Sequence, residues 1–258
     1  MSWKAARRLA RILSGSALLI FSQSLVFGMA VLPALVFWQA AREWHAIAPF
    51  QPYGGYVIVA MSLIPAYLVF CVALMAFSAG WNRLAGWRTA LGEYSVKDAE
   101  WPLIKWASYN ASINVVRIFC GESMRATPIW TWYLRWNGAS LGKNVHVNTA
   151  RLFDHNLLVL EDGVVIGGDA KLVAHLVEKG RVHATPVVLR RGAVVGINTV
   201  VSPGVEIGEK AAVGAMSFVP KHHKIPPYEV WGGVPVRLLK KYDEAEEDRK
   251  GLGVPVLS

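Results

Sequence analysis

The sequence predicts a membrane-anchored protein in which two transmembrane helices precede a solenoid of short β-strands. Three observations predict this architecture. The mean hydropathy is +0.33 and only 17% of the 258 residues are charged, which is too apolar for an ordinary soluble chain. Two uncharged runs, Ile12 to Ala41 and Trp44 to Asn82, lie near the start of the chain. After Gly138, aliphatic residues recur every six positions.

The two uncharged runs are predicted to be membrane spans, because each exceeds the ~20 residues that cross a bilayer core. The outer flanks of the pair are positively charged, and they carry Lys4, Arg7, Arg8, Arg11, Arg83 and Arg88. Positive flanks mark the cytoplasmic side. We therefore expect helices over roughly residues 14–38 and 56–80 in the cytoplasmic membrane, with both termini in the cytoplasm. A cleaved signal peptide is the alternative, but it would need a short apolar core and a small-residue cleavage site.

We expect four segments: a membrane anchor (1–90), a connecting segment (91–137), the repeats (138–241) and a C-terminal tail (242–258) that includes the charge run 243–248. Apolar residues of the connecting segment recur at three- and four-residue steps, at Trp106, Tyr109, Ile113, Val116 and Cys120. This spacing predicts an amphipathic helix. Such a helix either lies on the membrane surface or covers the end of the soluble domain.

The six-residue phase is the strongest pattern in the chain. It runs unbroken through Leu189, Val195, Val201, Ile207, Val213 and Val219, and earlier blocks keep it at Leu141, Val147, Phe153, Leu160, Ile166 and Leu172. A helix cannot carry this period on one face, because the stripe would drift by about 120° each repeat. Short strands and tight turns can form a coil with three flat sides and one aliphatic residue per side pointing inward. At ~18 residues per coil, the run makes about four to five coils.

The repeats and the closing segments 213–219, 225–227 and 231–237 resemble the hexapeptide-repeat acyltransferases. The stretches Tyr133–Gly142, Ala174–Glu178 and Thr127-Pro128 are similar to the membrane-anchored, acetyltransferase-like C-terminal modules of the poly-lysine synthetase class of peptide synthetases. The resemblance covers residues 138 to about 241. It implies a left-handed parallel β-helix, a homotrimer and an acyl-CoA donor such as acetyl-CoA.

The candidate catalytic residues lie where the repeat is interrupted. Leu172 and Leu189 are 17 residues apart rather than 18, and polar residues take aliphatic positions between them. In the resembling enzymes, a histidine in such a loop is the general base that removes the proton of an acceptor hydroxyl or amine. The match within 174–178 assigns this role to His175, with Glu178 orienting the imidazole.

The acceptor is expected to meet the coil below His175. His175 follows Leu172 by three positions as Asn156 follows Phe153, so Asn156 should lie one coil away and contact the acceptor or the base. Its neighbours Asp154 and His155 are assigned to substrate binding with it. The acceptor itself, a small molecule or a lipid-linked group, has no local sequence signature.

The resemblance also implies that CoA lies in the groove between neighbouring coils of two subunits. The corresponding positions are Gly196, Ala215 and Ser217 for the pantetheine, and Lys221 and Arg237 for the phosphates. The alternative is that the small residues serve only the turns and that the basic residues are ordinary surface charge.

The sequence also bears on a metal site, a nucleic-acid partner and a disulfide scaffold. A zinc site on His155, His175 and His183 would be similar to the γ-class carbonic anhydrases, but His175 and His183 are too far apart for that pattern, so no metal is expected. His175 is otherwise a solvated turn histidine. The net charge of +9 invites a nucleic-acid partner, but the positive residues gather beside the apolar runs, so none is expected. Two cysteines exclude a disulfide scaffold.

The primary hypothesis is thus a membrane-anchored acyltransferase that uses acyl-CoA and a hydroxyl or amine acceptor. An amide-bond-forming module that acts on activated amino acids is the first alternative. The second is a non-catalytic, membrane-anchored trimeric scaffold.

Overall fold

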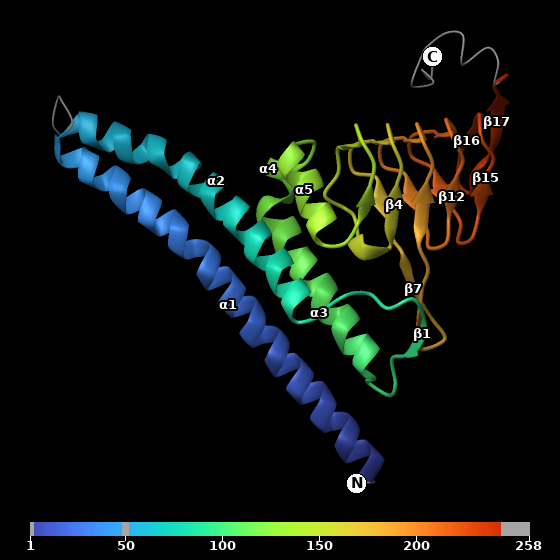
Figure 1. Ribbon diagram of the computed structural model, residues 1–258, viewed down its shortest axis with the longest axis horizontal. Coiled ribbons are helices and arrows are strands. Elements are labelled where there is room, and N and C mark those ends of the chain that lie inside the picture. Colours follow the sequence, from blue (N-terminus) through green and yellow to red (C-terminus); the bar gives the residue numbers. More distant parts are fainter. Residues whose placement is uncertain (1–2, 48–51, 244–258) are drawn as a thin grey trace. The chain divides into compact units, whose positions relative to one another are not determined.

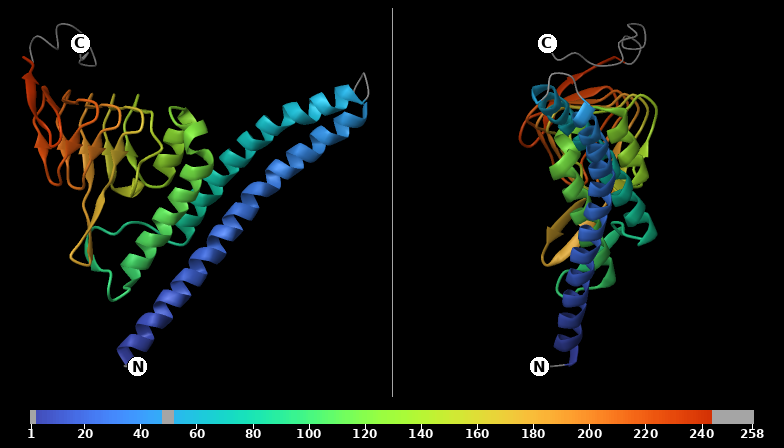
Figure 2. Two further views of the ribbon diagram at one scale, coloured as in Figure 1. Left: turned by 180° about the vertical axis from the view of Figure 1, so that it is seen from behind. Right: turned by 90° about the vertical axis from the view of Figure 1, so that its left-hand side faces the viewer.

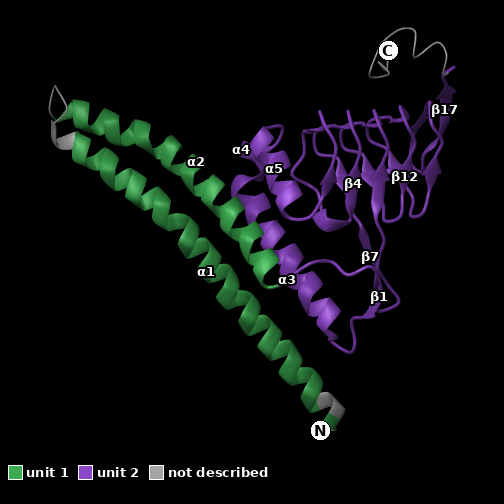
Figure 3. Cartoon of the chain, viewed as in Figure 1, with its two compact units in different colours: residues 1–85 green, residues 86–258 purple. Residues whose placement is uncertain are grey.

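The computed structural model describes residues 3–47 and 52–243, which form two compact units divided between Ala85 and Gly86 (Figure 3). The first unit therefore ends at Ala85, five residues before the boundary predicted for a membrane anchor. Only the first two residues of the predicted tail 242–258 are described, so nearly all of the charge run 243–248 lies outside the described residues.

The first unit is a pair of long helices, α1 (Trp3–Ile47) and α2 (Tyr53–Leu84), which lie side by side (Figures 1 and 2). The rings of Phe27 and Phe70 meet edge to face between them, with centroids 5.3 Å apart. Both helices are long and apolar enough to cross a membrane, by length and composition, over Ala6–Trp44 and Tyr53–Leu84. Only 17% of the residues in the apolar window of each helix are buried.

The second unit begins with β1 (Gly92–Ser95), α3 (Trp101–Val116), the π-helical turn η1 (Arg117–Gly121), α4 (Glu122–Met124) and α5 (Pro128–Trp136). Most of the predicted apolar stripe is buried: Tyr109, Ile113 and Val116 on α3 and Cys120 in η1, whereas Trp106 is half-buried. The Tyr109 hydroxyl donates to the carbonyl of Asn137 at 2.6 Å, and the Trp130 indole donates to the carbonyl of Thr149 at 3.1 Å. These helices therefore pack on the first coil, which favours the covering helix over the membrane-surface helix.

The repeats form a coil whose short strands build three parallel sheets (Figure 1). The first sheet contains β2 (Ser140–Leu141), β4 (Leu158–Leu160), β9 (Val187–Leu189), β12 (Glu206–Ile207) and β15 (Lys224–Ile225). The second contains β3 (His146–Val147), β5 (Val165–Ile166), β10 (Val194–Val195), β13 (Ala212–Val213) and β16 (Glu229–Gly232). The third contains β6 (Lys171–Leu172), β11 (Val200–Val201) and β14 (Phe218–Val219).

The strand register follows the predicted six-residue phase. Leu160, Leu189, Ile207 and Ile225 are paired in succession along the first sheet, and each is at most 2% exposed. The glycine that follows an inward aliphatic residue allows the coils to stack closely: a Cβ on Gly196 would lie 2.5 Å from the backbone nitrogen of Ala215. The core of this unit is therefore the axis of the coil.

The chain beyond the last coil folds back over it. Phe218 donates its backbone N–H to the carbonyl of Gly233, and Val236 donates to the carbonyl of Phe218, both at 3.0 Å. The strand β17 (Arg237–Lys241) then pairs with β16 in the antiparallel direction.

The first departure from the predicted repeat is a shift of one residue in the first coil. Leu152, and not Phe153, pairs with Leu172 and is fully buried. Asp154 then adopts a left-handed conformation with φ 52°, followed by the 3₁₀ turn η2 (His155–Leu157). This local turn absorbs the extra residues, so the phase predicted at Phe153 is wrong.

The second departure is a hairpin inserted between Leu172 and Leu189. The chain leaves the coil at Ala174 and returns at Thr185, whose N–H donates to the Ala174 carbonyl at 2.9 Å. The insert consists of the antiparallel strands β7 (His175–Glu178) and β8 (Arg181–Ala184), and β1 pairs with β8 (Figure 1). The 17-residue interval therefore contains a hairpin inserted in one side of the coil, and it is not a shortened coil.

Candidate active site

His175 stands at the base of the inserted hairpin, as the first residue of β7. Its Nδ1 lies 2.5 Å from Oδ2 of Asp154, the residue with left-handed backbone in the coil below. An ionised carboxylate only accepts hydrogen bonds, so Nδ1 carries the proton and Nε2 holds the lone pair. The imidazole is partly exposed, whereas Asp154 is fully buried. This arrangement is that of a base held by an orienting carboxylate.

Asp154 is held by side chains from outside the coil. Oδ1 accepts hydrogen bonds from the hydroxyl of Thr89 at 2.7 Å and from the amide of Asn110 at 2.9 Å. Burial alone would raise the pKa of Asp154, but the hydrogen bonds from His175, Thr89 and Asn110 lower it below its usual value. Asp154 is therefore a carboxylate at neutral pH. Sequence reasoning assigned it to substrate binding and found neither Thr89 nor the role of Asn110.

Two aromatic rings flank the imidazole of His175. The ring centroid of Trp106, on α3, is 4.9 Å away in an edge-to-face arrangement, and that of Phe153 is 6.5 Å away. On its open side, His175 lines a cavity of about 480 Å³ together with Val173, Leu176, Glu178, Val200, Val201, Ser202, Pro203, Phe218, Pro220 and Lys221. We call this cavity the His175 groove. Its wall is mainly apolar, and its polar residues besides His175 are Glu178, Ser202 and Lys221.

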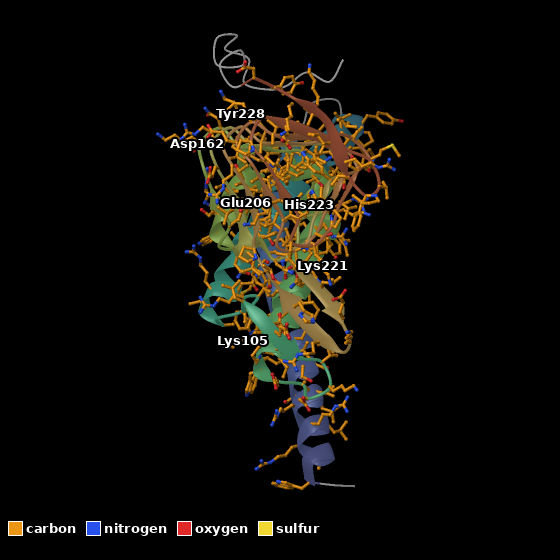
Figure 4. The ribbon with its side chains drawn as sticks, turned by 90° about the vertical axis from the view of Figure 1, so that its right-hand side faces the viewer. Lys105, Asp162, Glu206, Lys221, His223 and Tyr228 are labelled. Atoms are coloured by element: carbon orange, nitrogen blue, oxygen red, sulfur yellow. The ribbon has the colours of Figure 1, made fainter. Side chains whose placement is uncertain are left out.

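Glu178 does not contact the imidazole of His175 as expected. Its Oε2 lies 2.6 Å from Nζ of Lys221, which lies beside the hairpin in Figure 4. The hydrogen bond from Lys221 lowers the pKa of Glu178. In an extended strand, side chains three positions apart point to opposite faces, which separates Glu178 from His175. The carboxylate that contacts the imidazole is that of Asp154, so the contact expected between Glu178 and His175 is not the one observed.

The two neighbours of Asp154 are also occupied elsewhere. His155 is fully buried against the rings of Trp130 and Tyr133, and burial lowers its pKa to about 4. A buried, neutral side chain under two rings does not reach an acceptor. The amide of Asn156 accepts from the backbone N–H of Thr89 at 3.2 Å and donates to the Thr89 carbonyl at 2.9 Å. The structure thus gives both residues partners within the protein, and their contact with substrate stays a prediction.

His183 lies apart from the other two histidines of the zinc alternative. Its Nδ1 contacts Glu93 of β1 at 3.0 Å, and Arg181 contacts the same carboxylate at 3.3 Å. Within residues 3–47 and 52–243, no group of three histidine, cysteine or acidic side chains could hold a metal ion.

The five residues assigned to CoA lie in different settings. Lys221 lines the His175 groove. Gly196 allows close stacking of coils, and Ser217 is buried, where its hydroxyl accepts from the N–H of Gly233 at 3.1 Å. Ala215 lies in an exposed turn and Arg237 on the exposed strand β17. Of the five, Lys221 alone lines this groove.

Comparison with known proteins gives two curated relatives. The chain is 29% identical over 122 residues to the galactoside O-acetyltransferase of Escherichia coli (strain K12), which covers 42% of this chain and 59% of the relative. It is 29% identical over 112 residues to the delta-poly-L-ornithine synthetase of Acinetobacter baumannii (strain AB307-0294), which covers 43% of this chain and 8% of the synthetase. No family model matches.

Among solved structures, the hexapeptide-repeat acetyltransferase from Vibrio cholerae O1 biovar eltor, complexed with acetyl coenzyme A, has a TM-score of 0.38 and 25% identity over 42% of this chain and 62% of that chain. The chain spans about three fifths of the length of the first curated relative and under a tenth of the second. The two curated relatives confirm the predicted likeness both to hexapeptide-repeat acyltransferases and to the poly-amino-acid synthetases.

Proposed function

We propose that this chain, similar to hexapeptide-repeat acyltransferases, transfers an acetyl or other acyl group from acyl-CoA to a hydroxyl or amine acceptor. The observation that carries the proposal is the pair formed by His175 and the buried carboxylate of Asp154 at the edge of the His175 groove. The acetyl transfer in the name of the galactoside relative supports the same reaction class.

In this reaction, Nε2 of His175 takes the proton from the acceptor while the oxygen or nitrogen of the acceptor attacks the thioester carbonyl. The new bond to carbon forms, the carbon–sulfur bond breaks, and the CoA thiolate takes the proton from the imidazolium. Asp154 accepts the Nδ1–H of His175, which stabilises the imidazolium and fixes the tautomer of the neutral ring. A positioned general base of this kind contributes about 10²–10⁴-fold in rate.

The donor is proposed to enter the His175 groove. Val200, Phe218 and Pro203 supply apolar wall for the acyl group and the pantetheine, and Lys221 supplies a cation for a CoA phosphate. Lys221 is already paired with Glu178, so a phosphate that binds Lys221 would replace the Glu178 carboxylate as the partner of this lysine. Gly196, Ala215, Ser217 and Arg237 are proposed to contact CoA only if a neighbouring subunit places the donor beside them.

A homotrimer with left-handed coils is part of the proposal. Three exposed apolar residues follow one another in adjacent turns of the coil: Ile197 is 54% exposed, Met216 72% and Val234 71%. The N–H of Met216 donates to the Ile197 carbonyl, so these turns are neighbours. An apolar column on a water-facing coil suits a contact between copies. Light scattering of the purified protein should give three chains per particle, and Met216→Glu should reduce that number.

The hairpin α1–α2 is proposed to anchor the protein in the cytoplasmic membrane with both termini inside, where acyl-CoA is available. The basic residues on its outer flanks and its exposed apolar surface support this placement. A reporter fused after Ser258 that is active only outside the cytoplasm would contradict it.

The test of the function is release of CoA thiol by the purified protein, with acetyl-CoA and a panel of hydroxyl and amine acceptors. His175→Ala should lower turnover about 10²–10⁴-fold. His183→Ala is the matched control, because this histidine contacts Glu93 and not Asp154. Equal turnover in His175→Ala and wild type would refute the mechanism. Absence of transfer with every donor and acceptor would favour the scaffold.

The synthetase relative supports a second candidate, formation of an amide bond on an activated amino acid. An amide product that forms from an activated amino acid, and not from acetyl-CoA, would favour the amide-forming module. A product that hydroxylamine cleaves is an ester and would favour transfer to oxygen.

A further inference from the structure

The orienting carboxylate depends on a residue that precedes the whole coil. Thr89 lies five positions after Leu84, the last residue of α2, and before β1. It is 2% exposed, and its hydroxyl donates to Oδ1 of Asp154 at 2.7 Å. Oδ2, the other oxygen, faces His175. Thr89 and His175 therefore bind opposite oxygens of one buried carboxylate.

The backbone of Thr89 is held independently of its hydroxyl. The amide of Asn156 bonds to both its N–H and its carbonyl, at 3.2 and 2.9 Å. Asn156 is in turn fixed through its own N–H, which donates to the Tyr109 hydroxyl at 3.2 Å. A side-chain replacement at Thr89 therefore leaves two backbone hydrogen bonds in place and removes only the bond to Asp154.

Asp154 needs these donors because it is fully buried and charged. A buried carboxylate is unfavourable unless its oxygens accept hydrogen bonds. Thr89 and Asn110 both donate to Oδ1, and these two bonds fix the rotation of the carboxylate that points Oδ2 toward His175. Without them, the carboxylate is free to rotate or to recruit a water, and the imidazole loses its fixed tautomer.

We propose that Thr89, assisted by Asn110, is a positioning residue that holds Asp154 in the orientation needed by His175. This makes the segment between the helical hairpin and α3 a part of the active site rather than a passive linker. The proposal rests on the proposed function for its kinetic consequences, but the geometry that it describes exists without substrate.

The kinetic test compares Thr89→Val, Thr89→Ser and Thr131→Val. Valine keeps the shape of threonine without the hydroxyl, and Thr131, whose hydroxyl donates to the Pro128 carbonyl on α5, is the matched control. Thr89→Val should lower kcat about ten- to a hundredfold, the effect of one hydrogen bond to a charged group, with KM for acetyl-CoA unchanged within about twofold. Thr89→Ser should restore kcat, and Thr131→Val should match wild type.

A double-mutant cycle shows whether Thr89 acts through Asp154. In an Asp154→Asn background, Thr89→Val should cause little further loss of kcat, because the carboxylate that it positions is already gone. Losses that multiply, or a failure of serine to restore kcat, would overturn the proposal and leave Thr89 a merely structural residue.

A readout without turnover separates this proposal from the proposed function. In the full chain labelled with ¹⁵N-histidine, the Nδ1 proton of His175 should be protected from exchange with water, because Asp154 accepts it. Thr89→Val should speed that exchange at least about tenfold, as expected for the loss of one such hydrogen bond. Unchanged exchange would overturn the proposal even in an active enzyme. Faster exchange would support it even if wild type transfers no acyl group.

Discussion

Replacing Asp154 with asparagine tests the site most directly. Asparagine keeps the size of the side chain but removes the negative charge that faces Nδ1 of His175 at 2.5 Å. A hydrogen bond to a charged group contributes about 1.5–3 kcal/mol, which corresponds to a fall in kcat of roughly ten- to a hundredfold. The full contribution of a general base, about 10²–10⁴-fold, sets the upper limit. The assay is the initial rate of thiol release from acetyl-CoA at saturating acceptor, with the melting temperature measured in parallel.

Glu178→Gln is the matched control for Asp154→Asn. Both changes turn a carboxylate into an amide, but Glu178 is exposed and contacts Lys221 rather than the imidazole. We expect kcat within about twofold of wild type, since exposed ion pairs contribute little, and any change should appear in KM for the donor. If Glu178→Gln lowers kcat as much as Asp154→Asn, the carboxylate that serves His175 has been identified incorrectly.

Three further predictions concern stability. Ile207→Asp should abolish folding, because Ile207 is 0% exposed on the coil axis and a carboxylate there has no partner. The control, Glu209→Lys, should leave the melting temperature nearly unchanged. If both variants fold equally well, the register is wrong. His155 binds a proton below pH 6.5 in the unfolded chain but only below about pH 4 in the folded chain. The free energy of unfolding should therefore fall by about 3 kcal/mol as the pH drops from 6.5 to about 4. His155→Phe should remove most of this fall, as measured by thermal melts. Gly196→Ala should destabilise by about 1–3 kcal/mol in denaturant titrations, because its Cβ meets the backbone of Ala215; an unchanged midpoint would contradict the close stacking.

The inward positions of the coil could be predicted because each strand and turn repeats one local unit. Leu189, Ile207 and Ile225 obey the period since every coil between them has the same length. Leu152 does not follow the period, because the left-handed backbone at Asp154 and the turn η2 change the length of one side of the first coil. That error of one residue placed Asn156 at the position below His175, where the observed register places His155. The side chain that contacts the imidazole is that of Asp154, which precedes both and has a left-handed backbone.

The support of the active site could not be predicted from the sequence for a different reason. Thr89 lies 65 residues before Asp154 and Asn110 lies 44 residues before it. No period links positions at these separations, since the contacts depend on how α3 and the preceding segment fold over the first coil. Asn110 is one of several polar residues in α3, and no spacing or motif distinguishes it from the others.

The two ends of the coil have a consequence for solubility. A stack of parallel strands ends in rows of unpaired N–H and carbonyl groups, onto which another chain can add a strand. In the described part of this chain, α3 and α5 cover the first coil. At the other end, β14 bonds to Gly233 and Val236, and β16 pairs with β17. Lys240 and Lys241 on β17 add positive charges at that outer edge. End-to-end growth into fibres is thereby disfavoured, although every coil within the stack is itself a template for the next.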